Sequence, residues 1–231
     1  TSFPKNTPTR NVTLTLNLNN NKRGDIYSNN FTGRVQGLIG LLQSNDVPIY
    51  VRLPSQLVLV KRITAINGNP ITNIIDDPNT TEDNDSNWPA NYLKGIINGK
   101  VKPGDELEYT VYFLSNGDSD SINVKLCDLI PPKTAFLDAG FNGSTPVSGG
   151  GLPGANVGIA VERFGTIEYM TSPQDGDKGS YFPPASTPNA SCSGTNDNGA
   201  VTVDIGNLSR TGFGGTPAAA YGFIRFVVEV K

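Results

Sequence analysis

The sequence contains no histidine among its 231 residues. Imidazole is the general base of Ser-His-Asp and Cys-His catalysis, a principal zinc ligand and the side chain that titrates nearest neutrality. Its absence excludes those classes of enzyme and metal site. Carboxylate chemistry remains, but the acidic residues lie in turn-rich segments rather than as an isolated pair facing across a predicted cleft. We therefore expect no catalytic residues and no enzymatic activity.

Long apolar runs and clustered positive charge are also missing. The longest apolar stretch, from Pro48 to Ile63, is interrupted by Arg52, Lys61 and Arg62, which is incompatible with a transmembrane helix. The net charge is −3 and charges of both signs are scattered along the chain, so there is no basic stripe for a phosphate backbone. We expect neither a membrane span nor a nucleic-acid partner.

No segment shows a sustained helical period. The chain is instead rich in glycine and proline, with 26 and 17 residues, and its apolar residues come in short runs rich in Val, Ile, Tyr and Phe. Such runs between turn-forming residues are typical of strands, so we predict an all-β fold. The length is compatible with one large all-β domain or two smaller ones.

The clearest strand pattern lies near the start of the chain. Residues 11–19 alternate strictly, with aliphatic side chains on one face and only Asn and Thr on the other; the aliphatic residues are Val12, Leu14, Leu16 and Leu18. A polar tract, Asn19 to Asn30, separates this half-buried strand from the rest. The strand could pair within its own domain, or it could be donated to another subunit by β-strand addition. We predict that residues 1–30 are an extension made of a candidate donor strand and a polar linker, and that residues 31–231 form the main domain.

Further strands are predicted along that domain. Residues 31–42, 47–53 and 57–66 have strand composition, and the third ends at the turn Asn67-Gly68. Residues 107–113 alternate, and residues 122–126 return after a polar turn, which predicts a long hairpin. Residues 201–205 and 223–230 are the last predicted strands. Between them, residues 138–198 are rich in Gly, Pro, Ser and Asn and are interpreted as a long loop excursion with strand-like runs only in residues 157–169.

Two cysteines, Cys127 and Cys192, bear on that excursion. We predict that they form a disulfide that ties the excursion to the sheet, with Cys127 outside the core because it has the opposite parity from Val124 and Leu126. Two buried free thiols are the alternative. The disulfide, and a chain that begins with Thr1 as a mature product does after signal-peptide removal, lead us to expect an extracellular or cell-surface location. A trimmed chain would begin in the same way.

Calcium is the one ion that the sequence suggests. Hard oxygen ligands cluster in a loop, at Asp76, Asp77, Glu82, Asp83 and Asp85, but their spacing matches no complete calcium-binding loop. The alternative is that these side chains cap turns. No other cofactor is expected. Trp88 and the pair Tyr181-Phe182 could form a glycan platform or could pack in the interior.

Several motifs together resemble the conserved-repeat domain of unknown function found in bacterial, especially cyanobacterial, and archaeal surface proteins. They are Val60-Lys61-Arg62-Ile63-Thr64-Ala65-Ile66-Asn67-Gly68, Asn87-Trp88-Pro89, Pro103-Gly104-Asp105-Glu106, Tyr109-Thr110-Val111-Tyr112-Phe113, Cys127-Asp128, Asn198-Gly199-Ala200-Val201 and Tyr221-Gly222-Phe223-Ile224-Arg225-Phe226. The resemblance covers residues 57–230. It implies an immunoglobulin-like β-sandwich in an exported protein, and it brings no catalytic residues.

Two functions follow as expectations. The first is a structural subunit of a pilus-like extracellular filament or surface fibre, a homopolymer in which residues 12–18 are donated to the next subunit. The second is a monomeric cell-surface adhesive or ligand-binding module, with calcium as a possible stabiliser, in which the same strand pairs within its own domain. The long polar tract and a single module without a sortase-type tail, lipidated cysteine or membrane anchor favour the first. The sequence does not identify a glycan or host surface as partner.

Overall fold

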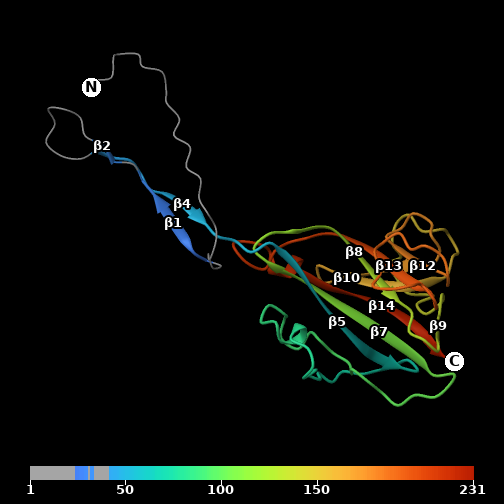
Figure 1. The fold of residues 1–231 in the computed structure, drawn as a ribbon. Helices are drawn as coiled ribbons and strands as arrows, with labels where there is room; N and C mark the ends of the chain where they lie inside the picture. Colours follow the sequence, from blue (N-terminus) through green and yellow to red (C-terminus); the bar gives the residue numbers. More distant parts are fainter. Residues whose placement is uncertain (1–23, 31, 34–41) are drawn as a thin grey trace. The chain divides into compact units, whose positions relative to one another are not determined.

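Figure 1 shows the fold in a computed structural model, which describes residues 24–30, 32–33 and 42–231. The candidate donor residues Val12, Leu14, Leu16 and Leu18 lie outside the described residues. The chain divides into two compact units between Leu53 and Pro54. This division differs from the predicted boundary at residue 30.

The described residues of the N-terminal unit form short antiparallel ribbons. Strand β1 (Ile26–Asn29) pairs with β4 (Val47–Tyr50), and β2 (Thr32–Gly33) pairs with β3 (Leu42–Gln43). Strand β1 lies inside the tract that we interpreted as a polar linker. Ile26, Val47 and Tyr50 remain exposed, so the described part of this unit has no core of its own. Two-stranded ribbons of this kind are only marginally stable alone.

The C-terminal unit contains the remaining strands, all paired antiparallel. They are β5 (Ser55–Ile66), β6 (Asn69–Pro70), β7 (Glu106–Gly117), β8 (Ser121–Leu129), β9 (Thr134–Phe136), β10 (Val157–Arg163), β11 (Thr166–Thr171), β12 (Gly179–Phe182), β13 (Ala200–Leu208) and β14 (Tyr221–Val230). The larger sheet has the order β11-β10-β14-β7-β5-β6, with β9 also on β14, and the smaller sheet has the order β12-β13-β8. The prediction of an all-β fold is confirmed.

Helix is almost absent from the described part of the chain. It contains two single-turn 3₁₀ helices, Glu82–Asn84 and Pro217–Ala219. Neither of these helices is long and apolar enough to cross a membrane.

The two sheets share one apolar core. Phe113 on β7 and Phe226 on β14 are fully buried and contact the same cluster as Val201 on β13 and Leu126 on β8. Alternation explains this arrangement, because every second residue of each strand points to the same face. The predicted hairpin between β7 and β8 is wrong. Their apolar faces meet across the core, so β7 pairs with β5 and β14 while β8 pairs with β13 in the other sheet.

The opposite face of the larger sheet is covered by the connection from β6 to β7. Trp88, Tyr92 and Leu93 from this connection pack against Tyr112 and Phe223 on the sheet. The loop therefore forms a second, smaller layer, and the acidic segment that we predicted as a loop is part of it.

The predicted loop excursion is only partly a loop. Residues 138–198 contain β10, β11 and β12, and β10 lies inside the larger sheet between β14 and β11. Phe164 and Gly165, with φ of 54° and 74°, form the tight turn between β10 and β11. Two positive φ values are typical of the two-residue turns that join antiparallel strands. The sequence signal was missed because Phe is an unusual residue at such a position.

Candidate functional site

One side of the two-sheet unit is closed by backbone hydrogen bonds. The outer edge of β11 is covered by residues 146–148, because Tyr169 N–H donates to Pro146 at 2.9 Å and Ser148 N–H donates to Tyr169 at 2.6 Å. On β12, Tyr181 N–H donates to Ser172 at 2.8 Å. Covering edge strands in this way prevents unwanted pairing with other chains.

The other side, between β5 and β8, is open. Strand β5 pairs with β7 along one edge. On its other edge, its partners among the described residues lie only near its end: β6 pairs with Ala65 and Ile66, and Ile96 pairs with Ile63. Within the described part of the chain, residues 55–62 have no strand beside that edge. Strand β8 likewise pairs only with β13. Because Ile63 directs its N–H and C=O outward, alternation predicts that Leu57, Leu59 and Lys61 do the same.

A groove of about 440 Å³ follows the inner face of this open edge. Its lining combines β5 with the facing core and β8: Leu57, Leu59, Lys61, Val111, Leu126 and Ile224. Leu59 is 44% exposed, which is high for a Leu in the middle of a 12-residue strand. The groove is therefore an apolar surface next to unpaired backbone groups.

A second hollow, of about 460 Å³, follows the outer face of the same edge. It is more polar, because Asp77, Thr80 and Glu82 from the covering loop join Val58 and Val60 in its lining. An edge strand with apolar space on one face and polar groups on the other can accept an added strand whose side chains alternate in the same way.

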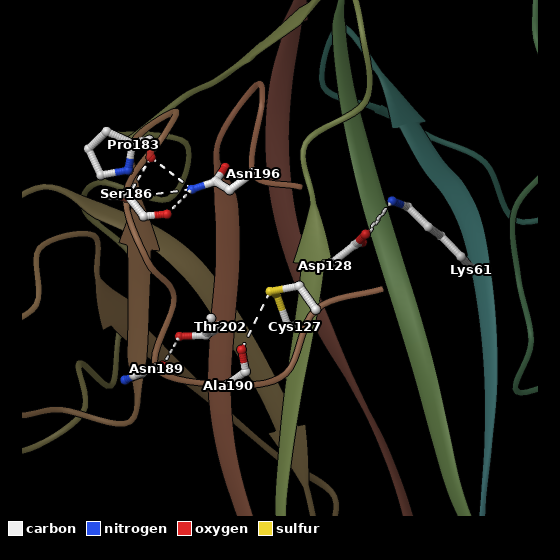
Figure 2. Close-up of a disulfide and its surroundings, with 10 residues drawn as sticks. Lys61, Cys127, Asp128, Pro183, Ser186, Asn189, Ala190, Asn196 and Thr202 are labelled. Atoms are coloured by element: carbon white, nitrogen blue, oxygen red, sulfur yellow. Dashed lines mark hydrogen bonds and ion pairs between the residues drawn. A yellow bond between two sulfur atoms is a disulfide. The ribbon is translucent and has the colours of Figure 1, made fainter. Parts of the chain in front are cut away.

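An ion pair connects the two sheets at this groove. Lys61 Nζ lies 2.9 Å from Asp128 Oδ1 and 2.7 Å from Oδ2, and Figure 2 shows the two side chains reaching toward each other from β5 and β8. The ammonium also lies 4.5 Å from the Tyr109 ring centroid and 5.5 Å from that of Phe226. Burial raises the pKa of the Asp128 carboxyl above its usual value, and the charge of Lys61 offsets only part of this effect.

The predicted disulfide is present and lies beside the groove. Cys127 and Cys192 are bonded with 5.2 Å between their Cα atoms, and the neighbours of Cys192, Ser191 and Ser193, join the lining of the groove. Hydrogen bonds hold the flanks of this segment, with Thr202 Oγ1 donating to Asn189 at 2.8 Å and Asn196 Nδ2 donating to Pro183 O at 2.8 Å (Figure 2). The disulfide thus positions one rim of the groove.

The calcium candidates are used by their own loop. Asp83 pairs with Arg62 and accepts a hydrogen bond from Asp77 N–H at 2.8 Å, while Asp85 accepts from Asn87 N–H at 2.9 Å. Burial alone would raise the pKa of the Asp83 carboxyl, but the bonds from Asp77 and Arg62 hold the pKa below its usual value. Asp76, Asp77, Glu82, Asp83 and Asp85 are not brought together: the described residues contain no group of three acidic, Cys or His side chains placed to hold a metal ion.

Of the aromatic candidates, Phe182 is buried, and Trp88 and Tyr181 are partly buried against other apolar side chains. Trp88 lies against both buried clusters on the outer face of the larger sheet, Tyr181 stacks on Phe136 at 4.3 Å between ring centroids, and Phe182 is buried. The groove residues on β5 and β8 were not identified from sequence. The one sequence feature that could have indicated the groove is Lys61. It is a charged residue on the same face of β5 as Leu57 and Leu59.

Comparison with known proteins adds nothing further. No family model matches the chain, no curated protein matches it, and no solved structure matches it.

Proposed function

We propose that this protein is a structural subunit of an extracellular, pilus-like filament. Residues 11–19 of one copy would add as a strand to the open edge of β5 in the next copy. The observation that carries the proposal is the unpaired edge of β5, with an apolar groove on its inner face and a polar hollow on its outer face.

The pattern of the donor segment suits this edge. Val12, Leu14, Leu16 and Leu18 would enter the apolar groove, and the intervening Asn and Thr side chains would face the polar hollow. The seven residues 12–18 extend about 20 Å at about 3.3 Å per residue. That length equals the length of residues 56–62 of β5.

The energetics allow a stable joint. Burying four aliphatic side chains contributes roughly 6–12 kcal/mol as an upper bound. Association costs an estimated 4–15 kcal/mol, so burial alone about breaks even. Backbone hydrogen bonds to the unpaired groups of β5, at about 1 kcal/mol net each, then favour the assembled state.

Other features agree with an exported assembly protein. Disulfides persist mainly in oxidising compartments outside the cytosol, which supports an extracellular location. The exposed Ile26, Val47 and Tyr50 suit a unit that completes its packing on a partner. Two antiparallel sheets with one core are compatible with an immunoglobulin-like sandwich and with the conserved-repeat family of surface proteins, and both remain part of the proposal.

Complementary variants test the joint. Leu14→Asp with Leu16→Asp damages the donor, Leu59→Asp damages the acceptor, and Ile122→Asp is a matched control because Ile122 is 60% exposed on β8 but does not line the groove. Two carboxylates in an apolar groove cost several kcal/mol unless they protonate or reach water. We expect polymer from the wild type and the control, and folded monomers from each damaged variant.

Mixing the two damaged variants gives the sharper result. A subunit with only a donor and a subunit with only an acceptor should form one-to-one heterodimers, measured by light scattering after size-exclusion chromatography. A wild-type chain that stays monomeric, or filaments that survive both changes, would refute the proposal. Unfolding of the donor variant by circular dichroism would place the strand in its own domain, as in a monomeric adhesive module.

A further inference from the structure

A separate cavity of about 360 Å³ lies on the face of the larger sheet that points away from the core. Arg225 on β14 lines it from the sheet, since it alternates with the fully buried Ile224 and Phe226. Thr72, Asn91 and Lys94 line it from the connection that covers this face. The cavity does not share residues with the groove beside β5.

Arg225 has hydrogen-bond donors to spare. Its guanidinium lies 4.2 Å from the centroid of the Phe223 ring, and its Nε forms an ion pair with Glu108 Oε1 at 3.7 Å, a distance too long for a hydrogen bond. Glu108 Oε1 instead accepts from Thr64 Oγ1 at 2.6 Å. The Arg225 Nε is buried and has no hydrogen-bond partner. Buried polar groups nearly always have a partner, and the Arg225 side chain is 32% exposed where it lines the cavity, so its guanidinium can donate to an acceptor that enters the cavity.

The rest of the lining supplies charge and neutral polar groups. Lys94 is exposed and makes no ion pair with any described residue, so Arg225 and Lys94 outnumber Glu108, the one acid in the lining. Asn91 and Thr72 are exposed at the rim, with no hydrogen bond to their side chains within the described chain. Tyr92 and Ile71 provide apolar surface between them.

We propose that this cavity binds a sugar that carries a carboxylate, such as a uronic acid. The guanidinium fork would bind the carboxylate with two parallel hydrogen bonds. The Asn91 amide and the Thr72 hydroxyl would bind sugar hydroxyls, and the volume is in the range of small-molecule sites. A carboxylate on a peptide shares the charge but lacks the hydroxyls. This binding function goes beyond filament assembly and does not depend on it.

Titration calorimetry on the full, disulfide-intact chain tests the site. The probes are methyl β-glucuronide, the neutral methyl β-glucoside and an acetylated dipeptide with a free carboxyl terminus. A charge-assisted hydrogen bond is worth enough to favour the glucuronide over the glucoside by about tenfold or more. Arg225→Gln should abolish this preference, and Arg225→Lys should weaken it because the charge stays and the fork is lost.

Two further variants control for folding and for the sugar. Arg163→Gln should bind normally, because Arg163 Nε is also buried without a partner but lines another cavity with Phe164 and Asp204. Asn91→Gly should weaken binding of the glucuronide and of the glucoside by a similar factor and leave any binding of the dipeptide unchanged. Glycine tolerates the Asn91 backbone, which has a φ of 61°. Equal binding of acid and neutral sugars, no binding at all, undiminished binding by a folded Arg225→Gln variant, or binding of the dipeptide alone would each overturn the assignment.

Discussion

The buried ion pair between Arg62 and Asp83 offers the strongest single test of how the covering loop is held. The two side chains are 3% and 4% exposed, and Arg62 also donates to the carbonyl of Ile75 at 3.2 Å. Arg62→Met keeps the aliphatic volume but leaves Asp83 as an uncompensated buried charge. Breaking a buried pair from one side costs about 3–5 kcal/mol. For a unit of this size, that loss lowers the Tm by roughly 6–20 °C.

The chain contains its own reporter for this perturbation. Trp88 is its single tryptophan, and its Nε1 donates to the Glu82 carbonyl at 2.8 Å in the loop that Asp83 anchors. If the loop detaches, the partly buried Trp88 becomes more exposed and its emission shifts to the red. The measurement is calorimetric melting together with tryptophan fluorescence.

Two comparisons make the result specific. Lys125→Met breaks the exposed pair with Asp204, whose side chains are 49% and 46% exposed, and should change stability by no more than about 1 kcal/mol. Arg62→Met combined with Asp83→Asn removes both charges and should be less destabilising than the sum of the single changes. If the Arg62→Met protein has the same Tm as the Lys125→Met variant and the same tryptophan emission as the wild type, the ion pair does not hold the loop.

Two other predictions concern the open side of the sheets. Cys127→Ser with Cys192→Ser opens a loop closed by residues 65 apart, and should lower the free energy of unfolding in urea by up to about 4 kcal/mol; no loss would mean that the unfolded chain is not restrained by the disulfide. Because the pKa of the Asp128 carboxyl is raised in the folded protein, wild-type stability relative to Asp128→Asn should be greatest below the ordinary Asp pKa of 3.8 and should fall as the pH rises through the folded value. Urea titrations from below pH 3.8 to neutral pH measure the difference in free energy of unfolding between the two proteins. A wild-type advantage that grows with pH would contradict the prediction.

The strands were predictable and their partners were not. The alternation of residues 107–113 and 201–205 identified β7 and β13 because half-buried strands expose one face and bury the other. The same alternation does not say whether the next strand lies beside a strand or across the core. This ambiguity produced the incorrect hairpin between β7 and β8.

The groove could be predicted from the sequence only in part. The disulfide followed from the positions of Cys127 and Cys192, but the groove depends on which edges have no partner, and edge positions follow from topology rather than from local pattern. Lys61 interrupts an apolar run, and the sequence could not show that Asp128 from another sheet would neutralise it. The position of the acidic loop is explained by Arg62, which pairs with Asp83 from 21 residues earlier in the chain.

The position of β14 has a consequence for how the chain acquires its structure. This strand pairs with β7, β9 and β10, so residues 221–230 form the middle of the larger sheet. During synthesis from the N-terminus, the segments of β5, β7 and β10 are therefore made before the strand that lies between β7 and β10. Folding dominated by such distant pairings is slow. The larger sheet can therefore be completed only once residues 221–230 are available to pair with β7 and β10.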